Sequence, residues 1–142
     1  MDHVVYTDSK AQEMELLVTG KKTMLIRGAT GRKLPYGRVN PGDTLYFINN
    51  NAEGLVKAKG VVTTVLNSEK MNPQESQALV KANQKQLQLS DKQYCKWAGK
   101  RYLVLISVES VQTITPFTID KSAYGNMDDW LAVGNIANVT NH

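Results

Sequence analysis

The sequence predicts an α+β domain built on a small, strongly bent β-sheet. Roughly six β-prone runs and about three short helical segments follow one another without the regular strand–helix alternation of a parallel sheet. Gly60 lies inside a long β-branched run, as expected where a strand must bend sharply. The 142 residues have the length of one ordinary domain, so we expect a single domain over residues 1–142.

The composition, 42% apolar and 21% charged, is that of a folded globular protein. No apolar run approaches the roughly 20 residues that span a bilayer, and residues 1–10 lack the features of a secretory signal. We therefore expect a cytoplasmic protein without a membrane partner. A single cysteine, Cys95, and two histidines near opposite ends of the chain, His3 and His142, predict no disulfide and no metal site. We also expect no cofactor.

The N-terminal region predicts a strand followed by a helix. His3–Tyr6 is β-prone, and Ser9 and Gln12 have the spacing of a capping box. A helix is therefore expected over about Lys10–Thr19, with Gly20 in the left-handed conformation at its end.

The next region predicts three strands separated by turns. Thr23–Arg27 and Thr44–Ile48 are β-prone, and Leu55–Leu66 is a longer β-branched run. Gly28–Asn40, with three glycines and a proline, predicts a basic loop. The turn Asn40–Asp43 combines proline and glycine as a type II turn requires.

Two more helices and two more strands are expected in the second half. Asn72 caps a helix predicted over Pro73–Leu87, with a thin apolar stripe, and Ser90–Asp91 begins a third helix that carries Tyr94, Trp97 and Ala98 inward and ends at Gly99. Arg101–Glu109 predicts a central strand, because apolar residues occupy both of its faces. Val111–Phe117 predicts a last strand. Met127–Leu131 predicts a single capped helical turn that packs Trp130 against the rest of the domain.

The strongest functional signal is a basic block between Gly20 and Asn40. It contains no acidic residue and six basic ones: Lys21, Lys22, Arg27, Arg32, Lys33 and Arg38. The net charge of +4 is mild, but a local block creates a positive field that attracts phosphate or another anion. The alternative is a solvated loop that only confers solubility.

Arg27 has the most informative position in this block. Alternation along a strand places it on the same face as apolar Leu25. An arginine on an inward face needs oxygen acceptors for its five donors. We therefore expect either an internal partner, such as Asp43 or Glu75, or a bound anion.

Other chemistry finds little support in the sequence. Gly28–Lys33 lacks the spacing of a phosphate-binding loop, and no G-x-S-x-G motif is present. Cys95 is interpreted as a packed apolar residue and Asp128–Asp129 as a helix cap.

The spacing of Gly20, Lys22 and Arg27, followed by the turn Pro41-Gly42-Asp43, resembles the signature of the ASCH family within the PUA-like superfamily. That signature is G-x-K-x-x-E-x-R, followed by a "pGD" turn into the next barrel strand. The resemblance covers about Met14–Val65, and the strand at Arg101–Glu109 fits the family layout. It implies a PUA-like β-barrel of five to six strands, a cleft lined by Lys22 and Arg27, and binding of RNA.

The resemblance also implies an enzymatic alternative. Some small relatives are similar to amidohydrolases of acylated cytidine, which use the motif lysine, a strand hydroxyl and a distant glutamate. Lys22, Thr23 and Glu75 would take these roles here, although Leu25 stands where the signature has an acid or a threonine.

The leading hypothesis is therefore an RNA- or nucleotide-binding domain. Arg32, Lys33 and Arg38 would hold a phosphate beside Lys21, Tyr36 or Trp130 would stack on a base, and Lys22 and Arg27 would contact polar edges. A third hypothesis is a protein-interaction module that uses the polar second helix or the basic loop, in which case partner capture would resist RNase.

Overall fold

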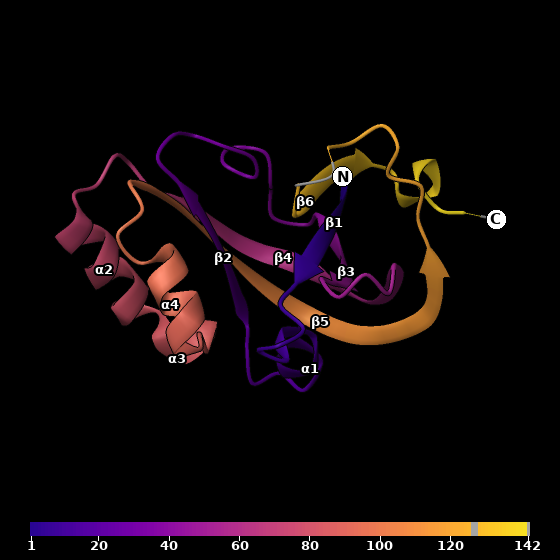
Figure 1. The fold of residues 1–142 in the computed structure, drawn as a ribbon, viewed down its shortest axis with the longest axis horizontal. Helices are drawn as coiled ribbons and strands as arrows, with labels where there is room; N and C mark the ends of the chain where they lie inside the picture. The colour runs from indigo at the N-terminus through magenta and orange to yellow at the C-terminus, as the bar shows by residue number, and fades with distance from the viewer. Residues whose placement is uncertain (126–127, 142) are drawn as a thin grey trace.

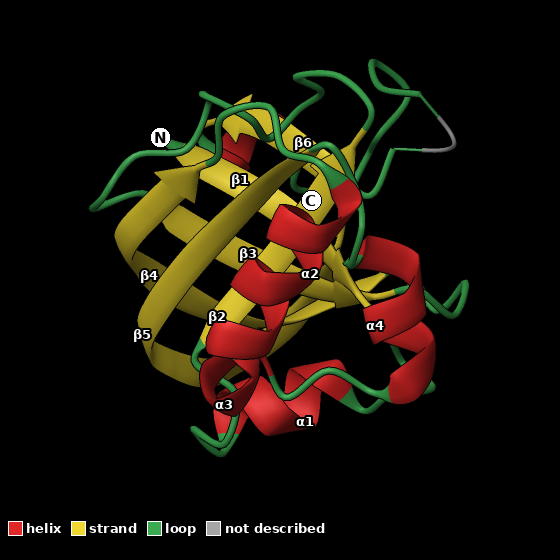
Figure 2. Ribbon diagram, turned by 90° about the vertical axis from the view of Figure 1, so that its left-hand side faces the viewer, coloured by secondary structure: helices red, strands yellow, loops and turns green. Residues whose placement is uncertain are grey.

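The computed structural model describes residues 1–125 and 128–141, and its strands form one strongly curved sheet (Figures 1 and 2). The sheet has six strands in the order β2-β5-β4-β3-β1-β6. In chain order they are β1 (Asp2–Thr7), β2 (Met24–Ala29), β3 (Thr44–Asn49), β4 (Leu55–Asn67), β5 (Tyr102–Thr118) and β6 (Trp130–Gly134). The helices of the described residues are α1 (Glu13–Val18), α2 (Pro73–Ala82), α3 (Gln84–Leu87), α4 (Asp91–Trp97) and the short 3₁₀ helix η1 (Ile136–Asn138).

The sheet curls because its two longest strands are irregular. β4 and β5 pair along most of their length, with register shifts that include one at Lys59/Val61, around Gly60. A Cβ atom at Gly60 would lie 2.8 Å from Cγ2 of Val111, so this close approach requires glycine. The expected α+β, PUA-like architecture is confirmed, with β1 and β3 parallel and the other strand pairs antiparallel.

The barrel remains open at one seam. In the strand order, β2 and β6 are the two ends of the sheet, so the described ladders leave a gap where a closed barrel would have another pair. The guanidinium of Arg27 on β2 crosses this gap and donates a hydrogen bond of 2.8 Å to the carbonyl oxygen of Tyr6 on β1. One side chain therefore links β2 to β1, two strands that are not neighbours in the sheet.

The first half of β5 is covered on both faces, as the sequence predicts for Arg101–Glu109, and β2 is covered in the same way. Leu25, Val104 and Ile106 lie in the core enclosed by the curved sheet. Ile26 and Leu103 pack on the opposite face, against residues of the helical segment. Successive side chains of a strand point to opposite faces of the sheet, so β2 and β5 contribute residues to two separate cores.

The helices differ from the expected boundaries in two places. α1 begins at Glu13 rather than near Lys10, because Gln12 has a positive φ of 54° and Ser9 makes no side-chain cap. The second predicted helix is interrupted at Asn83, so that α2 and α3 are separate. Ala78 and Ala82 of its expected apolar stripe are exposed.

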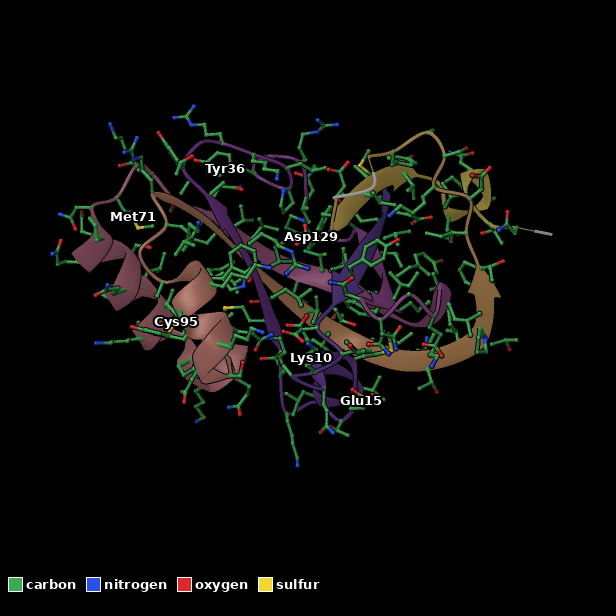
Figure 3. The ribbon with its side chains drawn as sticks, viewed as in Figure 1. Lys10, Glu15, Tyr36, Met71, Cys95 and Asp129 are labelled. Atoms are coloured by element: carbon green, nitrogen blue, oxygen red, sulfur yellow. The ribbon has the colours of Figure 1, made fainter. Side chains whose placement is uncertain are left out.

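The buried residues of α2 are instead Ser76 and Val80. α4 has the predicted start, since Ser90 and Gln93 form a complete capping box. Within α4, Cys95 was expected to be packed, but it is exposed (Figure 3).

The C-terminal half contains two larger corrections. The strands predicted at Arg101–Glu109 and Val111–Phe117 are one continuous strand, β5, which passes Ser110 with a positive φ of 53°. Trp130 begins strand β6, which pairs antiparallel with β1, instead of lying in a capped turn. Met127 of that predicted turn lies outside the described residues, as does His142.

His3 lies in the interior, although it is only the third residue of the chain. It is fully buried, its Nε2 lies 2.9 Å from Oδ2 of Asp43, and its Nδ1 accepts a hydrogen bond from Trp130. These contacts join β1, β6 and the turn that precedes β3.

None of the helices in the described residues has the length and apolar character that a membrane-spanning helix needs.

Candidate functional site

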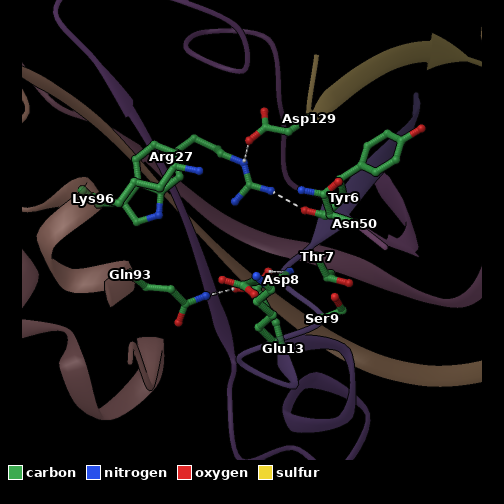
Figure 4. A pocket seen from close by; sticks show the side chains of 12 residues that line it. Tyr6, Thr7, Asp8, Ser9, Glu13, Arg27, Asn50, Gln93, Lys96 and Asp129 are labelled. Carbon is green, nitrogen blue, oxygen red and sulfur yellow. Dashed lines mark hydrogen bonds and ion pairs between the residues drawn. The ribbon is translucent and has the colours of Figure 1, made fainter. Parts of the chain in front are cut away.

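Two adjoining hollows lie over the open seam and share one wall. The shared residues are Arg27, Asn50, Lys96, Trp97 and Asp129. The first hollow, of about 280 Å³, extends toward the end of β1 and the start of α1 (Figure 4). The second, of about 410 Å³, extends toward the basic loop and the turn before β5. A ligand in either hollow would contact β2 and α4 together, and one in the first hollow would also contact β1.

Arg27 is the central side chain of the shared wall. It is only 7% exposed, and it donates hydrogen bonds of 2.8 Å to the carbonyl oxygens of Ile26 and Tyr6. Its Nε lies 3.2 Å from Oδ2 of Asp129, but the alignment is too poor for a hydrogen bond, so this buried donor has no hydrogen-bond partner among the described residues. The expected internal partner was Asp43 or Glu75, and the structure shows Asp129 instead.

The two hollows differ in charge. The first, which we call the mixed hollow, is lined by three cationic side chains (Lys10, Arg27 and Lys96) and three anionic ones (Asp8, Glu13 and Asp129). The second, which we call the basic hollow, is lined by four cationic side chains (Arg27, Lys33, Lys96 and Lys100) and Asp129 alone as an acid. An anion is therefore stabilised much more strongly in the basic hollow.

Trp97 is the aromatic side chain that lines both hollows. It is partly buried, and its ring centroid lies 4.7 Å from Nζ of Lys96 and 5.8 Å from Cζ of Arg27. Both distances are within the range of cation–π attraction. The combination of a partly exposed indole with cations around it is the kind of surface on which a nucleobase stacks beside its phosphate.

A buried ion pair lies directly behind the mixed hollow. Nζ of Lys22 is 3.5 Å from Oε2 of Glu13, and it also donates a hydrogen bond to the carbonyl oxygen of Leu87. Glu13 accepts further hydrogen bonds from the Asp8 amide and from Gln93. Burial lowers the pKa of Lys22, and the nearby Glu13 carboxylate opposes that shift. Lys22 thus holds Glu13 in place from behind and is itself 1% exposed.

The structure brings together only part of the predicted binding set. Arg27 and Lys33 line the hollows. Lys21 and Arg38 are exposed but do not line either hollow, and Lys22 is buried.

The predicted aromatic candidates are engaged elsewhere. Trp130 is 1% exposed, which leaves no free face for a base. Tyr36 donates a hydrogen bond to the Ser68 carbonyl oxygen, and its ring lies against Tyr102 with Arg32 over both rings.

The three residues of the enzymatic alternative have separate roles. Glu75 is exposed and completes the capping box of α2 through the Asn72 amide. Thr23 is exposed just before β2, while Lys22 is held by Glu13 and Leu87. Asp128–Asp129, expected to cap a helix, precedes strand β6, and Asp129 pairs with Arg27.

Sequence reasoning missed Lys96, Lys100 and Trp97. The sequence does contain a signal for them: Lys96 and Lys100 are four residues apart, with Trp97 between them, at the end of α4 and before β5. Such interleaving of aromatic and basic residues is typical of nucleic-acid surfaces. In the described part of the chain, no cluster of three His, Cys, Asp or Glu residues could hold a metal ion.

The same fold occurs in crystal structures of an ASCH protein from Zymomonas mobilis. The structure of this ASCH protein has a TM-score of 0.64 and 17% sequence identity, and the match covers 90% of our chain and 82% of the ASCH chain. A tyrosine-to-phenylalanine mutant has a TM-score of 0.67 and 15% identity, with 91% and 87% of the two chains covered. A serine-to-alanine mutant has a TM-score of 0.62 and 16% identity, with 82% and 73% covered. No family model matches the sequence, and no curated protein does.

Proposed function

Because the chain has the fold of an ASCH domain, we propose that it binds single-stranded RNA or a nucleotide-like ligand across the two hollows of the seam. One observation carries the proposal. A nine-tenths buried arginine, whose Nε–H makes no hydrogen bond and has only the ion-pair contact with Asp129, lies in the shared wall beside Trp97 and several lysines. A buried donor that makes no hydrogen bond is costly, and a ligand oxygen or ring nitrogen would satisfy it.

The chemistry of such a ligand follows from the lining. Lys33, Lys96 and Lys100 provide positive charge for a phosphate without a metal ion. Trp97 provides a stacking surface that tolerates any base. Single-stranded RNA presents both phosphate and unstacked base, whereas the bases of a duplex are stacked and paired. We assign no reaction to the site, because Lys22 and Glu75 are engaged in structural contacts.

The test is a fluorescence-anisotropy titration of a labelled single-stranded RNA at two salt concentrations. The site variant carries Lys33→Ala, Lys96→Ala and Lys100→Ala. The matched control carries Lys70→Ala, Lys81→Ala and Lys85→Ala, which remove the same charge from exposed positions outside the hollows. Arg27 itself is a poor target, because it also links β2 to β1.

We expect the site variant to bind at least about tenfold more weakly. If each lysine neutralises one phosphate, the slope of log affinity against log salt falls by about 2. The control should bind like the wild type. Equal losses in both variants would mean that only net charge matters, and unchanged binding by the site variant would remove the hollows from the interaction. Partner capture that resists RNase would instead favour a protein-interaction module.

A further inference from the structure

The two hollows offer different environments to the two ends of a nucleotide. The basic hollow combines Lys33 and Lys100 with the shared cations, and Asp129 is its one acid. The mixed hollow balances its cations with three carboxylates. A phosphate gains attraction in the basic hollow and meets repulsion from the carboxylates in the mixed hollow. The phosphate therefore belongs in the basic hollow, and the uncharged base in the mixed hollow.

The mixed hollow presents a donor and acceptors to that base. The donor is Nε–H of Arg27, which makes no hydrogen bond, contacts Asp129 only as an ion pair, and lies in a side chain that is only 7% exposed. The acceptors include the carboxylate of Asp8, whose Oδ1 accepts from the Ala11 amide and whose Oδ2 has no hydrogen bond among the described residues. Asp129 has a side chain that is 46% exposed, and it adds a second carboxylate.

Carboxylate oxygens accept hydrogen bonds and cannot donate them. They favour a base edge that carries an exocyclic amino group, as cytosine, adenine and guanine do. Uracil offers carbonyl oxygens on both sides of its single N–H, and these oxygens repel a carboxylate. The arginine donor is compatible with an acceptor of any base, so discrimination rests on the carboxylates.

We propose that the site selects a nucleotide with an amino-bearing base, bound with its phosphate in the basic hollow and its base in the mixed hollow. This inference rests on the proposed function, and it adds an orientation and a specificity to it. Asp8 is the specificity-determining residue, because it lines the mixed hollow, one of its carboxylate oxygens makes no hydrogen bond, and it takes no part in the ion pairs of the described residues.

The experiment is competition of short oligocytidylate and oligouridylate of equal length against the labelled RNA used above. These strands share phosphates and ring size, and their bases differ by an amino group against a carbonyl oxygen. The test variant is Asp8→Asn, which keeps an oxygen for the Ala11 amide and replaces the acceptor by a donor. The control is Glu15→Gln, which removes an exposed carboxylate of α1 outside both hollows (Figure 3).

We expect the wild type and Glu15→Gln to prefer oligocytidylate by about tenfold, and Asp8→Asn to lose that preference. Oligoadenylate should compete like oligocytidylate. Equal competition by oligocytidylate and oligouridylate would overturn the inference while leaving RNA binding intact. A preference that survives in Asp8→Asn would overturn the role of Asp8. Failure of the wild type to bind the labelled RNA would refute the proposed function itself.

Discussion

Replacement of Glu13 by glutamine tests whether the buried pair behind the mixed hollow stabilises the fold. The two side chains are 6% and 1% exposed, and Oε2 of Glu13 lies 3.5 Å from Nζ of Lys22. At that separation and an effective dielectric constant of about 20, the attraction is about 5 kcal/mol. Loss of one partner of such a pair costs about 3–5 kcal/mol, because the other charge stays buried without compensation.

The assay is urea unfolding of the wild type, Glu13→Gln, Lys22→Met and the double variant. With a slope of about 2 kcal/mol per molar urea, Glu13→Gln should lower the midpoint by about 2 M. The double variant should be more stable than Glu13→Gln, because no buried charge remains. Glu15→Gln, an exposed change on the same helix, should alter stability by less than about 0.5 kcal/mol.

The defect should also depend on pH in a definite direction. Burial lowers the pKa of Lys22 below 10.5 in the folded state, so the unfolded chain binds this proton more tightly. Stability therefore rises as pH increases from the folded pKa toward the unfolded value. Without Glu13 the folded pKa of Lys22 falls further, and the defect of Glu13→Gln should shrink as pH rises toward the unfolded pKa. A defect below about 1 kcal/mol, additive single effects or a pH-independent loss would each refute this reasoning.

Three other predictions concern separate parts of the molecule. Burial favours the protonated carboxyl of Asp43, but hydrogen bonds from Asn40 and His3 hold its pKa below 3.8. The ionised Asp43 therefore stabilises the folded protein above pH 3.8, and this stabilisation is lost as pH falls through the folded pKa. Acid unfolding of Asp43→Asn should therefore show a weaker pH dependence than that of the wild type. Gly60→Ala should lower stability by about 1–3 kcal/mol in thermal unfolding, since its Cβ would meet Val111; an unchanged melting temperature would argue against this tight packing. RNA should quench tryptophan emission in the wild type but not in Trp97→Phe, and quenching that persists there would assign the signal to buried Trp130.

Local signals predicted most of the elements but not their exact ends. The capping box at Ser90 needs only residues within one helical turn, so α4 was predictable. The break between α2 and α3 at Asn83 depends on packing. Leu87 of α3 packs in the same core cluster as Ile26 of β2, while Ala78 and Ala82 of α2 are exposed. Propensity alone would continue that helix.

The site itself was predictable only in part. The inward position of Arg27 followed from strand alternation, and the basic character of the loop that contains Lys33 followed from charge patterning. Tyr36 and Trp130 were plausible stacking residues by type. Their burial and contacts depend on neighbours far away in the sequence, such as Ser68 for Tyr36 and His3 for Trp130.

The sequence by itself determined the α+β class, the two-faced character of the first half of β5, the bend at Gly60 and the need of Arg27 for oxygen acceptors. These features depend on the period of a strand, the size of a side chain and the chemistry of a guanidinium. Only the tertiary structure decided that Asp129 and Tyr6 would be the partners of Arg27 and that Trp97 would stand beside it. The physical reason is that the partner of a buried charge depends on which strand edges meet. Here the curl of the sheet brings β1, β2 and the start of β6 together at an open seam.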